Sequence, residues 1–124
     1  MQRMMLQAKL HGARLTHADL HYEGSCGIDA ALLELSGIRE SQYLEIYNVT
    51  NGERFTTYAL MSPRGGGEIS LNGAAARKAA VGDSLIICAY AIYDEAELEG
   101  YKPKVVILDE RNKPAHRPYR PVRP

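Results

Sequence analysis

Alternation of hydrophobic and polar residues predicts β-strands along most of residues 1–109. The stretch 4–15 alternates loosely, with Leu6, Ala8 and Leu10 separated by polar side chains, as in a strand with one buried face. Stretches rich in β-branched, aromatic or aliphatic residues follow at 43–49, 54–60, 69–71, 84–93 and 104–108. The stretch at 84–93 is the most hydrophobic and is expected in the core.

Two short helical segments are expected between these strands. Residues 28–37 carry a stripe of leucines, with Asp29 as the expected N-cap and Gly37 as the C-terminal stop. Residues 72–79 predict one helical turn, with Asn72 as its cap. Many short strands and two helical pieces in a chain of this length indicate a mainly β fold, a compact barrel in one domain.

Glycines mark the expected turns. Asn51-Gly52 joins two of the strands and favours a type I′ hairpin turn with positive φ at both positions. The glycines at 65–67 predict a flexible loop, because the Lys-Ser/Thr pair of a phosphate-binding loop does not follow them. Residues 22–27 contain two glycines around Ser25 and predict a sharp bend.

The end of the chain differs in composition from the rest. From Arg111 onward there are five basic residues, no acidic ones and four of the six prolines. Proline at this density removes backbone donors and disfavours both helix and sheet, so we expect a domain over 1–109 and an extended, flexible tail over 110–124.

Composition limits the function classes. Fifteen Lys and Arg balance fifteen Asp and Glu, a neutral total that argues against nucleic-acid binding. No apolar run is long enough for a membrane helix, and the first residues do not resemble a secretory signal. Two cysteines make a poor disulfide framework. We therefore expect a cytoplasmic protein that contacts neither membrane nor nucleic acid.

Several residues invite a chemical interpretation. Three histidines, His11, His17 and His21, have spacings that fit no standard metal site, so no metal is expected. Cys26 could act as a nucleophile, but a buried structural thiol is the commoner case. Gly24-Ser25 is either a plain bend or the site of an uncommon reaction, in which the Ser25 hydroxyl attacks the preceding carbonyl carbon. The dipeptide alone leaves both interpretations open.

Three blocks of sequence point to one family. Residues 17–26, residues 48–59 and residues 70–76 with 81–83 resemble the pyruvoyl-dependent aspartate 1-decarboxylases, and the match runs in order over 1–106. The resemblance implies a double-psi β-barrel with two short helical segments. It also implies a zymogen that cleaves itself between Gly24 and Ser25 into chains 1–24 and 25–124, and a homotetramer with active sites at subunit interfaces.

The resemblance further implies the chemistry. Ser25 would become a covalent pyruvoyl group that forms a Schiff base with L-aspartate, so that neither pyridoxal phosphate nor a metal is needed. The implied products are β-alanine, for pantothenate biosynthesis, and CO2, with Tyr58 as the proton donor. The processing residues implied are Gly24, Ser25, Thr57 and Asn72. Some members of the family need an accessory maturation protein.

The same resemblance implies a substrate site. Lys9 and Arg54 would bind the two carboxylates, although each could equally be a solvated charge on a strand. Further substrate contacts are implied for Thr57, Gly73, Ala74 and Ala75, and His11 and Tyr22 lie near the family's site. Gly27 departs from the family, where alanine is frequent, and is expected to add flexibility.

Two other functions stay open on the sequence alone. The chain could be a non-catalytic β-barrel binding module, in which Gly24-Ser25 is a plain bend. It could also be a pyruvoyl decarboxylase of another amino acid, against which the two expected cations are the internal argument.

Overall fold

The computed structural model describes residues 1–115, which form one mixed sheet of eight strands with short helices at its ends. In chain order the elements, with η for a 3-10 helix, are β1 (Gln2–Arg14), β2 (His17–Asp19), β3 (Ser25–Asp29), α1 (Ala30–Ser36), β4 (Tyr43–Asn48), β5 (Arg54–Ser62), β6 (Ile69–Asn72), η1 (Gly73–Lys78), β7 (Ser84–Asp94), η2 (Glu95–Leu98) and β8 (Lys104–Ile107).

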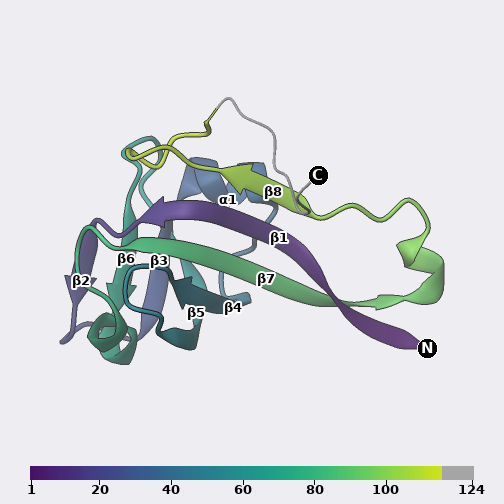
Figure 1. Ribbon diagram of the computed structural model, residues 1–124, viewed down its shortest axis with the longest axis horizontal. Helices are drawn as coiled ribbons and strands as arrows, with labels where there is room; N and C mark the ends of the chain where they lie inside the picture. Colours follow the sequence, from purple (N-terminus) through teal and green to yellow (C-terminus); the bar gives the residue numbers. More distant parts are fainter. Residues whose placement is uncertain (116–124) are drawn as a thin grey trace.

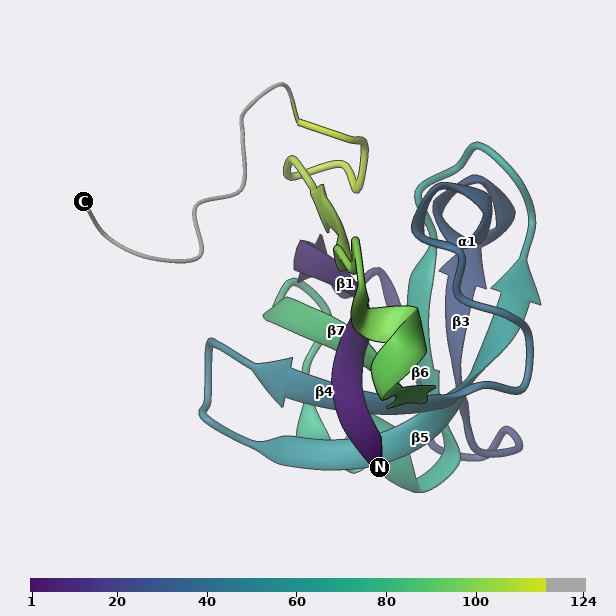
Figure 2. The same ribbon diagram turned by 90° about the vertical axis from the view of Figure 1, so that its right-hand side faces the viewer.

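The order of strands across the sheet is β2-β6-β3-β5-β4-β7-β1-β8. Three pairs are parallel, namely β1 with β8, β2 with β6 and β3 with β5, and the others are antiparallel. Figure 2 shows the sheet curled, with α1 at one end of β3. The mainly β fold class is confirmed, and the crossed strand order fits the expected double-psi barrel.

The core lies on the inner face of the curled sheet. Alternate residues of β1, β4 and β7 point into it, and Leu10, Ile46 and Ile87 are fully buried. Burying each such side chain contributes about 1.5–3 kcal/mol. The expectation that the hydrophobic stretch 84–93 lies in the core is therefore confirmed for its first half, which packs between β1 and β4.

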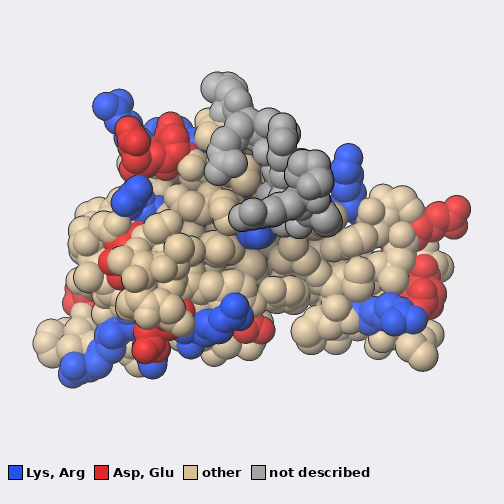
Figure 3. Space-filling model, in the orientation of Figure 1, with Lys and Arg blue, Asp and Glu red and all other residues tan. Residues whose placement is uncertain are grey.

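The second half of β7 and the start of β1 leave the body as a two-stranded arm that leads into η2 (Figure 1). An ion pair of 2.6 Å between Arg3 and Glu95 joins β1 to η2. Over the face drawn in Figure 3, basic and acidic side chains are interspersed, without a large area of one sign among the described residues. Within residues 1–115, no helix has the length and apolar character that crossing a bilayer requires.

The hairpin of β4 and β5 is confirmed, but the predicted type I′ turn is wrong. Gly52 has a φ of 80°, whereas Asn51 does not adopt positive φ. The buried Asn48 shapes a wider turn, because its Oδ1 accepts the Thr50 N–H at 2.9 Å and its carbonyl accepts the Gly52 N–H at 2.8 Å. A side chain outside the Asn-Gly pair therefore decides the loop.

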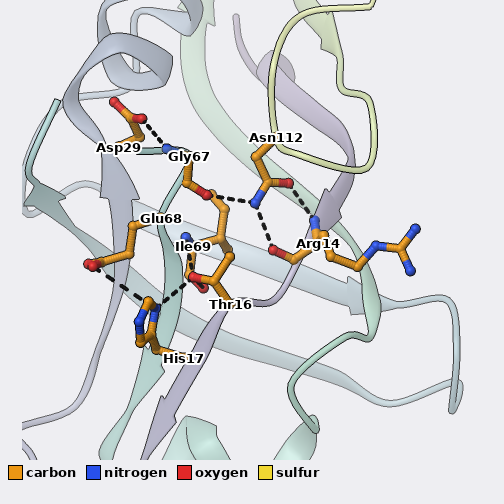
Figure 4. A network of polar contacts seen from close by, with 8 residues as sticks. All are labelled: Arg14, Thr16, His17, Asp29, Gly67, Glu68, Ile69 and Asn112. Atoms are coloured by element: carbon orange, nitrogen blue, oxygen red, sulfur yellow. Dashed lines mark hydrogen bonds and ion pairs between the residues drawn. The ribbon is translucent and has the colours of Figure 1, made fainter. Parts of the chain in front are cut away.

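The glycine loop at 65–67 is anchored, so its interpretation as a flexible loop is wrong. Asp29 caps α1 as predicted, through the Ala31 N–H at 2.8 Å. Its carboxylate also accepts the N–H groups of Gly65 at 3.0 Å and Gly67 at 2.7 Å. These donors outweigh the raising effect of burial and hold the pKa of Asp29 below its ordinary value. One carboxylate thus fixes both the helix and the loop (Figure 4).

The described part of the expected tail packs on the barrel. Asn112 is only 1% exposed, with a φ of 59°, and its amide bonds the backbone N–H and carbonyl of Arg14 and the carbonyl of Gly67 (Figure 4). A bridge between Leu108 and Pro114 closes the turn. The boundary expected at residue 110 therefore does not separate a packed body from a detached tail. The remainder of that tail, 116–124, lies outside the described residues.

Candidate active site

Ser25 opens β3 at the boundary between exposed and buried chain. Gly24 is exposed, whereas Ser25 is fully buried, and the four residues after it are buried as well. The Ser25 hydroxyl accepts the Asn72 Nδ2–H at 3.0 Å and donates to the Glu23 carbonyl at 3.4 Å. A serine hydroxyl held at both its donor and its acceptor side is oriented next to the Gly24–Ser25 peptide bond.

The bend expected over 22–27 ends earlier than predicted, because Ser25 to Gly27 belong to β3. The chain reverses between β2, which the sequence pattern did not reveal, and Gly24. Asp19 shapes this turn, since its Oδ1 accepts the His21 N–H at 3.0 Å. Gly24 is not among the residues with positive φ.

Asn72 faces Ser25 across the sheet. The two residues are partners in the antiparallel pairing of β6 with β3, which sets their side chains on the same face. Asn72 also precedes η1, but it makes no side-chain capping bond there. Its interpretation as a simple helix cap is therefore wrong, and its side chain is committed to the Ser25 hydroxyl.

Thr57 and Tyr58 lie on β5, the other neighbour of β3. The parallel register pairs Cys26 with Ala59, and continuing it backwards sets Ser25 beside Tyr58 and Gly24 beside Thr57. Successive residues of a strand alternate in direction. Tyr58 therefore shares the outer face with Ser25 and is 40% exposed, whereas Thr57, whose partner on β4 is the buried Leu44, points to the inner face.

Lys9 and Arg54 lie on that same outer face, but at a distance from Ser25. Lys9 on β1 pairs with Cys88 on β7, Cys88 pairs with Glu45 on β4, and Glu45 pairs with Thr56 on β5. Directly paired residues share a face of the sheet, so Lys9 lies on the same face as Thr56 and, two residues away on either side, Arg54 and Tyr58. Four strand spacings of about 4.8 Å separate the strand of Lys9 from β3, and Arg54 precedes Tyr58 by about 13 Å of strand.

Two tyrosines that the sequence interpretation did not single out support Arg54. The Arg54 guanidinium stacks over the Tyr47 ring, with Cζ 4.2 Å from the centroid. The Tyr47 hydroxyl is hydrogen-bonded to that of Tyr90 at 3.0 Å, and burial is the first cause of the raised pKa of Tyr90. The observed register of the hairpin pairs Tyr47 with Arg54, whereas the predicted two-residue turn pairs Arg54 with Val49, so the sequence interpretation did not indicate this contact.

The remaining predicted site residues differ in their burial and in how near to Ser25 they lie. Gly73 is buried at the start of η1, while Ala74 is exposed and Ala75 is half-buried. Tyr22, 60% exposed, and Asn72 help to line a cleft of about 670 Å³ beside β3. His11 follows Lys9 on β1 and is remote from Ser25 in the strand order. A larger cleft of about 880 Å³, between α1 and the end of β5, contains none of the predicted site residues.

Gly27 has a steric role in place of the expected flexibility. It lies buried in β3 between β5 and β6. A Cβ at this position would collide with the Ser70 hydroxyl and would come within 2.7 Å of the Ser62 hydroxyl. The two serines thus occupy the space that an alanine side chain would need.

The alternative chemistry weighed for the cysteine and histidines gains no support. Burial raises the pKa of Cys26 to about 12, so its thiol stays protonated and fits the structural interpretation. His17 Nδ1 lies 2.8 Å from the Thr16 hydroxyl, next to Glu68 (Figure 4). Among residues 1–115, no three His, Cys, Asp or Glu side chains come together as a metal site would require.

Comparison with known proteins identifies the family. The model of the aspartate decarboxylase family matches residues 1–115. The chain is 64% identical over 113 residues to the aspartate 1-decarboxylase of Methylibium petroleiphilum, covering 91% of this chain and 94% of that protein. It is 64% identical to that of Ralstonia pickettii, with the same coverage, and 61% identical to that of Methylococcus capsulatus, covering 90% and 89%. A match that spans nearly all of the described barrel, including the Ser25–Asn72 pair, leads to one conclusion: the chain belongs to the aspartate decarboxylase family.

Proposed function

We propose that this chain is a self-processing enzyme that converts L-aspartate into β-alanine and CO2. The observation that supports this most is the Ser25 hydroxyl, held by Asn72 at 3.0 Å directly after the exposed Gly24. The names of the relatives supply aspartate as the substrate and decarboxylation as the reaction.

The first step is cleavage of the chain by its own serine. The Ser25 oxygen attacks the Gly24 carbonyl carbon, the C–N bond breaks, and an ester with a free Ser25 amine results. Loss of the Ser25 Cα proton then expels the Gly24 carboxylate and leaves dehydroalanine at residue 25. Water adds to its imine tautomer and releases ammonia, which leaves a pyruvoyl group on the chain 25–124. The exposure of Gly24 leaves the Gly24–Ser25 bond accessible to water.

The local residues fit this route. The buried Ser25 side chain has a polar partner in Asn72 that can follow it through the shift to an ester. The register of β3 and β5, extended back from the pair Cys26–Ala59, would bring Thr57 next to Gly24, where its hydroxyl would polarise the carbonyl that is attacked. Donors aimed at a carbonyl oxygen that gains negative charge lower the barrier to such a step.

The pyruvoyl group would supply the ketone that accepts the electrons left when an α-amino acid loses CO2. The chain's own residues then bind the substrate. Gly73, Ala74 and Ala75 offer small side chains beside the cleft, so that backbone N–H groups can approach a carboxylate.

The two cations support an assembled site. Lys9 lies four strands from Ser25 in the sheet and Arg54 lies at the start of β5, and we infer that a second copy of the chain presents them to the same aspartate. The stacked Arg54 offers a planar fork that suits a carboxylate. This separation supports a homotetramer whose active sites lie between subunits, with His11 and Tyr22 at their margins.

The cellular setting completes the proposal. Cys26 and Cys88 are both free, which suits the reducing cytoplasm. There the β-alanine would serve pantothenate biosynthesis. Cleavage of the purified chain without any addition would show that it needs no maturation protein.

Intact mass and denaturing electrophoresis after prolonged warm incubation test the proposal. We expect two fragments, 1–24 and 25–124, the larger one lighter by one ammonia than a peptide that starts with serine. Ser25→Ala should stay in one piece and release no β-alanine from L-aspartate, while Ser84→Ala, a serine away from the site, should behave as the original chain. An unbroken chain would support a binding module, and turnover of a different amino acid would refute the substrate.

A further inference from the structure

Gly73 and Gly24 are in direct backbone contact. Gly73 begins η1 with a φ of 67°, in the left-handed region that favours glycine. A Cβ on Gly73 would lie 2.7 Å from Gly24 Cα, 2.8 Å from Gly24 N and 3.1 Å from the Tyr22 carbonyl oxygen. All three are backbone atoms, so a side chain here would have to displace the chain itself.

The other left-handed glycines show that this contact is particular. Gly67 and Gly12 also combine positive φ with a nearby backbone atom, but the carbonyl oxygens that a Cβ would approach there belong to Arg111 and Leu108, away from Gly24. Gly37, Gly52, Gly65, Gly82 and Gly100 also have positive φ, but a Cβ on any of them would meet nothing within 4 Å. At those five positions glycine is required by the backbone torsion alone. At Gly73 both the torsion and the close approach require it, and the residue approached is the one that precedes the bond to be cleaved.

Asn72 and Gly73 together contact both sides of that bond. The Asn72 amide holds the Ser25 hydroxyl at 3.0 Å, and the bare Gly73 Cα supports the backbone of Gly24. The reaction requires the hydroxyl oxygen to approach the Gly24 carbonyl carbon along a defined path. Misplacement of reacting groups by about 1 Å can lower a rate about a hundredfold.

We propose that Gly73 is a positioning residue for cleavage of the Gly24–Ser25 bond. The missing side chain lets the Gly24 backbone pack against η1 while Asn72 orients the nucleophile. This inference rests on the proposed self-processing. It assigns Gly73 a role before the substrate arrives, in addition to the substrate contact that the family resemblance implies.

The test is the rate of cleavage of three purified full-length chains, followed by intact mass at fixed times. Gly73→Ala should cleave more slowly than the original chain by about tenfold or more. Gly100→Ala is the matched control, since Gly100 has a φ of 73° and open space around its Cα. It carries the same conformational cost without the collision and should cleave at the original rate.

A second variant separates strain from collision. Asn tolerates the left-handed region better than Ala, so Gly73→Asn should fold more readily while presenting the same Cβ to Gly24. Circular dichroism and thermal unfolding accompany each rate. Slow cleavage in a folded Gly73 variant, with a normal rate in Gly100→Ala at a comparable melting temperature, supports the inference.

Each other outcome is decisive as well. Original rates in the folded Gly73 variants would overturn the positioning role and leave self-processing intact. Loss of folding in both Gly73 variants would also overturn it, because Gly73 would then serve the fold as a whole. Failure of the original chain to cleave would instead refute the proposed function itself.

Discussion

Replacing Asn112 by alanine should destabilise the barrel more than its place near the end of the sequence suggests. The Asn112 side chain accepts the Arg14 N–H at 2.7 Å and donates to the carbonyls of Arg14 and Gly67, each at 2.8 Å. Since the residue is 1% exposed, water cannot easily replace these partners. The substitution leaves three backbone groups of β1 and the glycine loop unpaired.

The expected magnitude follows from these contacts. Three hydrogen bonds at about 1 kcal/mol each give about 3 kcal/mol. The φ of 59° at this position adds about 1 kcal/mol, because alanine adopts the left-handed region less readily than asparagine. Asn112→Gly relieves the torsion but still lacks the amide, so it should lose only the first part.

The assay is urea unfolding at neutral pH and constant protomer concentration, since assembly contributes to stability. All variants are made in the Ser25→Ala background, so that every sample contains one intact chain. We expect a loss of about 4 kcal/mol for Asn112→Ala and about 3 kcal/mol for Asn112→Gly. Asn51→Ala, which removes two exposed bonds, one of 3.0 Å to the Lys78 carbonyl and one of 2.9 Å from the Glu53 N–H, is the control and should lose less than about 1 kcal/mol. Equal, small losses for Asn112→Ala and Asn51→Ala would refute the view that segment 109–115 is part of the packed barrel.

Three further predictions concern pH, substrate affinity and packing. Because the pKa of Asp29 is below its ordinary value of 3.8 in the folded chain, its stabilising effect is present above that value and is lost as the pH falls through the lowered pKa. Asp29→Asn should therefore flatten the fall in urea-unfolding stability between about pH 5 and pH 2, and an unchanged acid slope would contradict the assignment. Tyr90→Phe removes the hydrogen bond to the hydroxyl of Tyr47, whose ring stacks under Arg54. Steady-state kinetics should then show KM for aspartate raised about fivefold with kcat nearly unchanged. An unaltered KM would argue against a role of Tyr90 in supporting Arg54. Gly27→Ala should cost about 1–3 kcal/mol in unfolding free energy and regain it when Ser62 and Ser70 are also alanine, whereas full stability of the single variant would rule out the crowding.

Local patterns predicted the elements of the barrel well. The alternation that marked residues 4–15 corresponds to β1, and the hydrophobic stretch 84–93 corresponds to β7. Asp29 and Gly37 bound α1 as expected, because capping depends on residues that are neighbours in the sequence. Strand order depends on contacts between distant segments, and no local pattern revealed that β3 would lie in parallel beside β5.

The sequence proposed a set of site residues but not how they are arranged in the fold. The family resemblance singled out Ser25, Asn72 and Tyr58, and three neighbouring strands bring them to one face. The same resemblance named Lys9 and Arg54 without showing how far they are from Ser25 in one chain. The separation of Lys9 along the sheet is set by the strand order, which no local pattern revealed.

Asn112 escaped the sequence interpretation because its surroundings pointed the other way. A stretch rich in proline and arginine is typical of an extended tail, and composition averages over the one residue that matters. The side chain of Asn112 mimics a backbone peptide and closes a gap between β1 and the glycine loop. Asp109, whose side chain accepts the N–H groups of Arg111 and Lys113, was the available signal for an ordered turn there.

Glycine shows most clearly why the same letter can have different physical meanings. Gly100 is required by its torsion, Gly27 by the two serines that crowd it at an ordinary torsion, and Gly73 by both torsion and contact. A sequence contains no record of which applies, because contact depends on segments about fifty residues apart. In this barrel the distinction has a chemical consequence, since Gly73 touches Gly24 and is proposed to position the bond that the chain cleaves. A glycine scan read out by cleavage would therefore separate the glycines that serve the fold from the one that serves the reaction.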